Sequence, residues 1–147
     1  MDDQLAEILL FANQNPSSWL ATSENNQPHV RGMLMWFADE SGFYYHTAKA
    51  KRIYQQVLKN PKIEAAFIRN ADDPNNFATL HVAGVVEEVK DKDLEQRLFL
   101  ERPWLWQNIK NAQVDTEVVI FRIVKGTAYI WNMTWNIKED KIPRVKF

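Results

Sequence analysis

Cysteine is absent from the sequence, which excludes disulfides, thiolate metal sites and a cysteine nucleophile. Glycine is scarce, with only 4 among 147 residues, so the glycine-rich loops that cradle phosphates in common nucleotide-binding folds are excluded. No apolar run approaches the roughly 20 residues of a membrane-spanning helix. The net charge of -1 gives no overall attraction to nucleic acid or to an anionic membrane. We therefore expect neither nucleic acid nor membrane as a partner.

What remains is the composition of an ordinary globular protein, with 46% hydrophobic and 25% charged residues. A chain of 147 residues suits a single domain, here residues 1–147, with a real core. The first residues are acidic and do not resemble the basic start of a signal peptide, so the cytoplasm is the expected location. Six tryptophans are many for this length, and such rings line cofactor pockets or fill cores.

Hydrophobic periodicity and turn residues predict more strands than helices. Neighbouring strands are mostly joined by turns, which favours an antiparallel sheet whose edges close into a barrel. Residues 103–113 are expected to be irregular or partly helical, and Gly84 is expected to form a bulge. Helices are expected over 3–13, 48–59 and Asp91 to Arg102; strands over 17–23, 29–39, 43–47, 62–69 and 77–89, and a last hairpin over 116–133 that turns at Lys125-Gly126.

Cations gather at the start of the second expected helix, at Lys49, Lys51 and Arg52. The start of a helix carries a partial positive charge and favours anions, so these residues are poorly placed for the helix alone. Either they form a solvated surface, or they bind an anion such as a phosphate together with the helix N–H groups. Arg31, in an otherwise apolar strand, is open to the same two interpretations: a rim position or a buried cation that needs an anion.

Other candidate residues carry weaker signals. His46 lies next to the cationic segment, and no histidines and carboxylates share the spacing of metal ligands, so no metal is expected. Met33 and Met35 are expected to fill the core. Trp104 and Trp106 could cap a pocket, but packing of their segment onto the barrel is the preferred interpretation.

A larger pattern runs from about Trp19 to Met133. It joins "HVRGMLMWF", Thr47 at a strand end, the basic pair Lys51-Arg52 four and five residues later, Asn60-Pro61, and "HVAGVVEEV". This pattern resembles the FMN-binding split-barrel proteins related to pyridoxamine 5'-phosphate oxidase, in particular their small general-stress and nitroimidazole-resistance-like members. The resemblance implies an α+β fold, mainly antiparallel β: a Greek-key split barrel with flanking helices. It also implies a homodimer with two FMN sites at the interface.

The resemblance further implies which residues bind FMN. In such proteins the first of these segments lies along the flavin and its phosphate, the strand end lies near the ribityl chain and phosphate, and the basic pair holds the phosphate. A late aromatic residue faces the flavin of the other subunit. The corresponding residues are Arg31, Gly32, Met33, His46, Thr47, Lys51, Arg52 and Trp131.

The expected function is that of an FMN-dependent oxidoreductase acting on a small organic substrate, because a flavin performs the redox chemistry itself. The true oxidase also carries an arginine- and histidine-rich C-terminal segment for its substrate. Residues 132–147 contain no histidine, so oxidation of pyridoxamine 5'-phosphate is not expected. Two alternatives stay open: a flavin-binding sensor or storage protein without turnover, and a reductase that uses a deazaflavin. No residue stands out as a catalytic acid or base.

Overall fold

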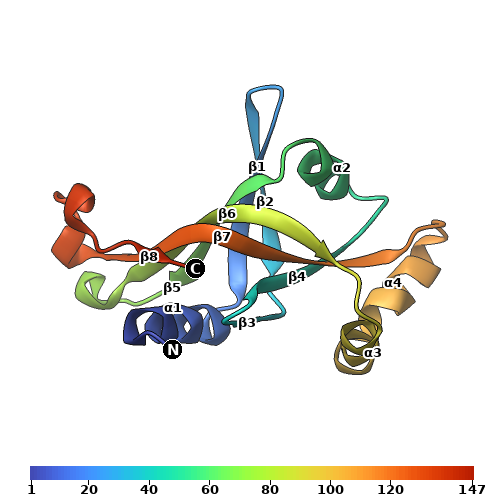
Figure 1. Ribbon diagram of the computed structural model, residues 1–147, viewed down its shortest axis with the longest axis horizontal. Helices are drawn as coiled ribbons and strands as arrows, with labels where there is room; N and C mark the ends of the chain where they lie inside the picture. The colour runs from blue at the N-terminus through green and yellow to red at the C-terminus, as the bar shows by residue number, and fades with distance from the viewer.

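A computed structural model describes all residues from Met1 to Phe147 (Figure 1). Eight strands form one antiparallel sheet in the order β2-β1-β5-β6-β7-β4-β3, with β8 beside β7. The expected α+β class with a mainly antiparallel sheet is therefore confirmed. The elements are α1 (Asp3–Gln14), β1 (Ser17–Glu24), β2 (Gln27–Leu34), β3 (Phe37–Asp39), β4 (Gly42–Ala48), α2 (Arg52–Lys59), β5 (Lys62–Arg69), η1 (Pro74–Asn76), β6 (Ala78–Val89), α3 (Lys92–Glu101), α4 (Trp104–Ala112), β7 (Val118–Asn132), η2 (Met133–Trp135), η3 (Glu139–Lys141) and β8 (Val145–Lys146).

The core lies on the inner face of the curved sheet. Alternate residues of each strand point to this face, so that Phe67, Leu80 and Ile130 stand in one row across β5, β6 and β7. Helix α1 adds Ile8 and Phe11 to the same cluster and lies along one side of the barrel (Figure 1). A second, smaller cluster joins α3 to the sheet through the buried residues Trp36, Tyr44, Leu98 and Ile120.

The expected strand over 29–39 is two strands. β2 ends at Leu34 and pairs with β1, whereas β3 begins at Phe37 and pairs with β4. The two residues between them are buried: Met35 N–H donates to Pro16 O (2.9 Å), and Trp36 N–H donates to Tyr44 O (2.8 Å). The chain thus changes its strand partner at this break, which brings the two ends of the sheet together.

The expected last hairpin is wrong. Lys125 has a left-handed backbone (φ 54°), but the chain continues forward, and β7 is one strand of 15 residues. The irregularity is a bulge opposite Gly84, where the β6–β7 register shifts, and this confirms the bulge expected at Gly84. Gly126 is needed there because a Cβ atom on it would lie 1.8 Å from Ala83 O.

Two helices near the cationic segment also differ from expectation. α2 begins at Arg52 with Lys51 as its N-cap, because residues up to Ala48 belong to β4. The segment after Pro103 is fully helical as α4.

The helix after Asp91 is confirmed, and the Asp91 carboxylate accepts hydrogen bonds from the N–H groups of Asp93 and Leu94. None of the helices combines the length and apolar composition needed to cross a bilayer.

Candidate functional site

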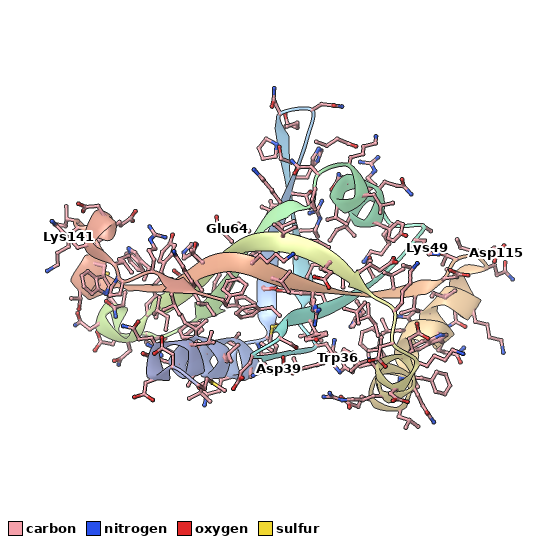
Figure 2. The ribbon with its side chains drawn as sticks, viewed as in Figure 1. Trp36, Asp39, Lys49, Glu64, Asp115 and Lys141 are labelled. Carbon is pink, nitrogen blue, oxygen red and sulfur yellow. The ribbon has the colours of Figure 1, made fainter.

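One cavity of about 300 Å³ gathers most of the residues named from the sequence. It lies where the ends of β2 and β4 meet the start of α2, and α4 forms its outer wall. Figure 2 shows Lys49 at the turn that leads from β4 into α2. Five of the eight expected site residues line this cavity. The lining is Gly32, Met33, Leu34, His46, Thr47, Ala48, Lys51, Trp104, Leu105, Asn108, Ile109 and Val118.

Thr47 is buried at the end of β4, and its Oγ1 has no hydrogen-bond partner in the protein. A buried hydroxyl without a partner costs about 1–3 kcal/mol, and such groups are rare in native proteins. Because Thr47 lines the cavity, a ligand with polar oxygens can supply the missing partner.

Lys51 lines the same cavity as Thr47 and is the N-cap residue of α2. The cap makes no side-chain hydrogen bond, and the first turn holds no acidic residue. The Tyr54 N–H already donates to Lys51 O, so the N–H groups of Arg52 and Ile53 and the ammonium are the donors free for an anion. Lys49 is different, because its Nζ forms an ion pair with Glu117 (2.6 Å). Arg52 is exposed and does not line the cavity. Of the three cations, Lys51 is therefore the one placed to meet a ligand in the cavity.

Arg31 is held by protein groups beside the cavity. Its NH1 donates to Leu20 O (3.2 Å) and to Thr22 Oγ1 (3.0 Å), and its NH2 donates to Gln56 Oε1. Gln56 lies on the buried face of α2, so Arg31 connects β2 to that helix. Burial lowers the pKa of this guanidinium, which remains charged because arginine is so basic.

His46 is buried and contacts Arg102, which was not among the site residues expected from the sequence. Arg102 NH1 lies 2.6 Å from His46 Nε2, and the same guanidinium donates to Leu34 O (3.3 Å) and Met35 O (3.0 Å). Burial, first, and then the charges of Arg102 and Lys51 lower the pKa of His46 to about 4. The imidazole is therefore neutral near pH 7.

Helix α4 supplies a third of the cavity wall, with Trp104, Leu105, Asn108 and Ile109. Trp104 was expected to pack onto the barrel; it meets the His46 ring of β4 edge-on at 6.0 Å and also lines the cavity. Trp106 does pack, against the second core cluster. The spacing i, i+1, i+4, i+5 of the four lining residues could have predicted this helical face.

Trp131 lies far from the cavity within one chain. Val118 is at the cavity end of β7 and Trp131 near the other, which puts about 40 Å of strand between them. In Figure 1 this strand runs along the long axis, from α4 at one end of the molecule to the C-terminal segment at the other. The Trp131 ring packs edge-on against Phe77, and its Nε1 is buried without a partner.

The outer face of the sheet joins these two regions. A second cavity of about 430 Å³ on this face includes Trp19 and Ile68, and it shares Gly32, Met33 and Leu34 with the first. Trp19 and Leu34 are 53% and 43% exposed. Strand pairing aligns one row of this face across five strands: Leu34, Ser17, Ile68, Thr79 and Trp131.

The sequence model of the pyridoxamine 5'-phosphate oxidase family matches residues 1–131 of this chain. Among curated proteins, none is similar enough in sequence to match.

Solved structures of the same fold include a NimC/NimA family protein from Clostridium acetobutylicum, with a TM-score of 0.69 and 19% identity over 97% of this chain and 92% of that one. General stress protein 26 from Bacillus anthracis has a TM-score of 0.69 and 17% identity over 98% of this chain and 99% of that one. These likenesses confirm the split barrel.

The heme storage protein HutZ from Vibrio cholerae also has this fold, with a TM-score of 0.61 and 16% identity over 86% of this chain and 92% of that one. The fold alone therefore does not fix the cofactor, and the side chains of the cavity must carry that argument.

Proposed function

This chain belongs to the pyridoxamine 5'-phosphate oxidase family, and on that premise we propose that it is an FMN-dependent oxidoreductase acting on a small organic molecule. The carrying observation is the unpartnered Thr47 hydroxyl in a cavity that is also lined by Lys51, the N-cap residue of α2. A phosphate monoester fits this arrangement, because it offers oxygens to the hydroxyl, to the ammonium and to the free helix N–H groups. Thr47 and Lys51 would hold the FMN phosphate.

The other cavity residues suit the rest of such a ligand. The β2 segment Gly32–Leu34 and the apolar residues of α4 form walls for a flat ring. When bound, FMN supplies the transfer of an electron pair to or from a substrate, so the protein needs to bind and orient rather than to react.

We propose a symmetric dimer in which the outer face of the sheet is the interface. Leu34 and Trp131 stand at opposite ends of one row, with Ile68 of β5 at its centre. A two-fold axis along β5 exchanges these two ends, so Trp131 of one copy lies over Leu34 of its partner, next to the partner's cavity. Trp131 therefore belongs to the site only through the second copy, and a self-complementary face of this kind is typical of symmetric dimers.

The substrate is proposed to differ from pyridoxamine 5'-phosphate. The C-terminal segment contributes Trp135, Ile142 and Val145 to a surface hollow that they share with Ile8 of α1. None of its residues lines the cavity beside Lys51. The chain therefore brings no C-terminal side chain to a second phosphate in its own cavity, and residues 132–147 hold no histidine that could serve the partner's cavity.

The test begins with the ligand that copurifies with the protein. Its absorption spectrum and mass distinguish FMN from a deazaflavin, and turnover of a reduced nicotinamide with a panel of small acceptors distinguishes an enzyme from a binding protein. A deazaflavin, or bound FMN without any turnover, would replace the proposal by the corresponding alternative.

The phosphate site is tested by titrating the ligand-free protein with FMN and with riboflavin, which lacks the phosphate. Lys51→Gln should weaken FMN about 10- to 100-fold, since a charge-assisted hydrogen bond contributes about 1.5–3 kcal/mol. Riboflavin affinity should stay the same. Thr47→Val should act in the same direction with a smaller effect, and Arg52→Gln should change FMN affinity only a few-fold.

Lys59→Gln is the matched control, because Lys59 is an exposed cation at the other end of α2. Its affinity for both ligands should equal that of the parent. An equal loss of FMN and riboflavin in Lys51→Gln would show general damage to the cavity, and no loss of either would contradict a phosphate site at Lys51.

A further inference from the structure

Arg102 joins three segments next to His46, which lines the cavity. It is the C-cap residue of α3, and its guanidinium donates to the carbonyls of Leu34 and Met35, where the chain leaves β2. The same guanidinium faces His46 Nε2 on β4 at 2.6 Å. Its position is therefore fixed by two backbone groups independently of His46.

This contact determines where the imidazole carries its proton. A guanidinium has only donors and stays charged, so His46 Nε2 must be the acceptor. A neutral imidazole that accepts at Nε2 has its hydrogen on Nδ1. The protein gives Nδ1 no acceptor, because the contact with Arg102 is the only side-chain hydrogen bond of His46, and His46 lines the cavity.

The surroundings keep the ring in this state. The charged groups that act on it are Arg102 from α3 and Lys51 from the start of α2, both cations that oppose protonation, and no carboxylate acts on the ring. The Trp104 ring stands edge-on to the imidazole, at 77° between the two planes, and limits its rotation.

We propose that Arg102 is a positioning residue that holds His46 as its Nδ1–H tautomer, so that the cavity presents a fixed hydrogen-bond donor to an acceptor oxygen of its ligand. The oxygen belongs to a carbonyl or carboxylate group, either on the flavin or on a small molecule bound beside it. His46 thereby selects ligands that carry such an oxygen and serves as a donor rather than as a base. The ligand part of this inference rests on the proposed function, but the tautomer is a property of the free protein.

Nitrogen and carbon chemical shifts of isotope-labelled protein report the tautomer directly. The signals of His46 are assigned by their loss in His46→Gln. Near neutral pH the parent should show a protonated Nδ1 and an unprotonated Nε2. Arg102→Met should lose this preference, so that Nε2–H becomes populated, and the pKa of His46 should rise toward its ordinary value. Lys92→Met removes an exposed cation from the same helix and should leave the tautomer unchanged.

Two additions then locate the acceptor oxygen: FMN alone, and FMN with benzoate as a planar carboxylate. A shift of the Nδ1–H signal with FMN alone assigns the acceptor to the flavin, and a shift only with benzoate assigns it to the second ligand. A parent protein whose His46 carries its proton on Nε2 would overturn the inference. The inference would also fail if FMN fluorescence shows binding but neither addition shifts the Nδ1–H signal of His46. Absence of FMN binding would instead count against the proposed function. The tautomer of His46 in the ligand-free parent would still decide the role of Arg102, even if Arg102→Met does not fold.

Discussion

At the scale of single residues, three buried polar atoms have no partner in the chain: Thr47 Oγ1, Arg122 Nε and Trp131 Nε1. Arg122 is compensated, because its other nitrogens donate to Tyr44 and Glu87. Thr47 and Trp131 have no other side-chain polar atom to use. They lie at opposite ends of the sheet, yet the proposed two-fold axis brings both toward the same ligand. The two unpartnered atoms thus support one ligand site that is shared between the two copies of the proposed dimer.

His46 makes the stability of the ligand-free protein depend on pH. Its pKa is about 4 in the folded protein against 6.5 for an ordinary histidine. Below about pH 6.5 His46 therefore binds a proton in the unfolded chain but stays neutral in the folded protein, so the free energy of unfolding falls as the pH falls toward 4. Between about pH 7 and pH 4.5 the parent should lose roughly 2–3 kcal/mol more free energy of unfolding than His46→Gln.

Urea denaturation of both proteins at the two pH values measures this difference. Acidic side chains also titrate in that range, but they are the same in both proteins and cancel in the comparison. Identical pH profiles would mean that the folded protein accepts the proton on His46 as readily as the unfolded chain does.

At the scale of elements, the bulge in β7 brings the backbone of this strand close to β6 at Ala83 and Gly84. A Cβ atom on Gly126 would meet the backbone of Ala83 and Gly84 at 1.8 to 2.8 Å, and backbone cannot move aside as the end of a side chain can. Gly126→Ala should therefore lower the free energy of unfolding by about 2–4 kcal/mol. Chemical denaturation with circular dichroism detection measures the loss.

Gly32→Ala is the control for that substitution. It lies in β2, and a Cβ atom there would make only an ordinary contact of 3.8 Å with the Trp19 ring. Its stability should stay within about 0.5 kcal/mol of the parent. Comparable losses in both variants would contradict the close approach at Gly126.

The sequence predicted elements best where a pattern is local. The strand 62–69 and the N-cap at Asp91 were both found by such patterns. The last hairpin was not, because Lys125-Gly126 suits a tight turn and a bulge equally, and only the partner strand β6 decides between them. The break after Leu34 was missed for the same reason, since a change of strand partner leaves no mark in a continuous apolar run.

The candidate site was predictable in part. The pattern around Thr47 and Lys51 identified one side of the cavity. Arg102 gave no signal, because an arginine at a helix end before a proline is ordinary, and its contact with His46 spans 56 residues. Contacts of that kind depend on how elements pack and not on spacing along the chain.

At the scale of the whole molecule, the proposed dimer makes the outer sheet face sensitive to charge. Trp19 lies on β1 in this face and is 53% exposed, so a glutamate there is tolerated in a monomer but would be buried without a partner in the dimer interface. Trp19→Glu should therefore sediment as a 17.3 kDa species, and FMN should bind several-fold more weakly, because stacking by the partner's aromatic ring contributes about 1 kcal/mol.

Leu100→Glu is the matched control, since Leu100 is 71% exposed on α3, away from that face. It should remain dimeric with unchanged FMN affinity. Trp131→Ala should weaken FMN and riboflavin equally, because it removes ring contact and no phosphate contact. A parent that is monomeric and still holds FMN would disprove both the interface and the shared site.

Helix α4 has one further consequence. None of its residues is buried, although four of them face the cavity, whereas the residues that close the barrel are fully buried. Substitutions at the exposed cavity-lining residues Trp104 and Asn108 should therefore act on what the cavity accepts while leaving the barrel almost unaffected. In evolutionary terms the barrel and the cavity lining are separable: new ligands can be reached by drift at a few positions of one short helix, without the loss of stability that usually limits the divergence of a binding site.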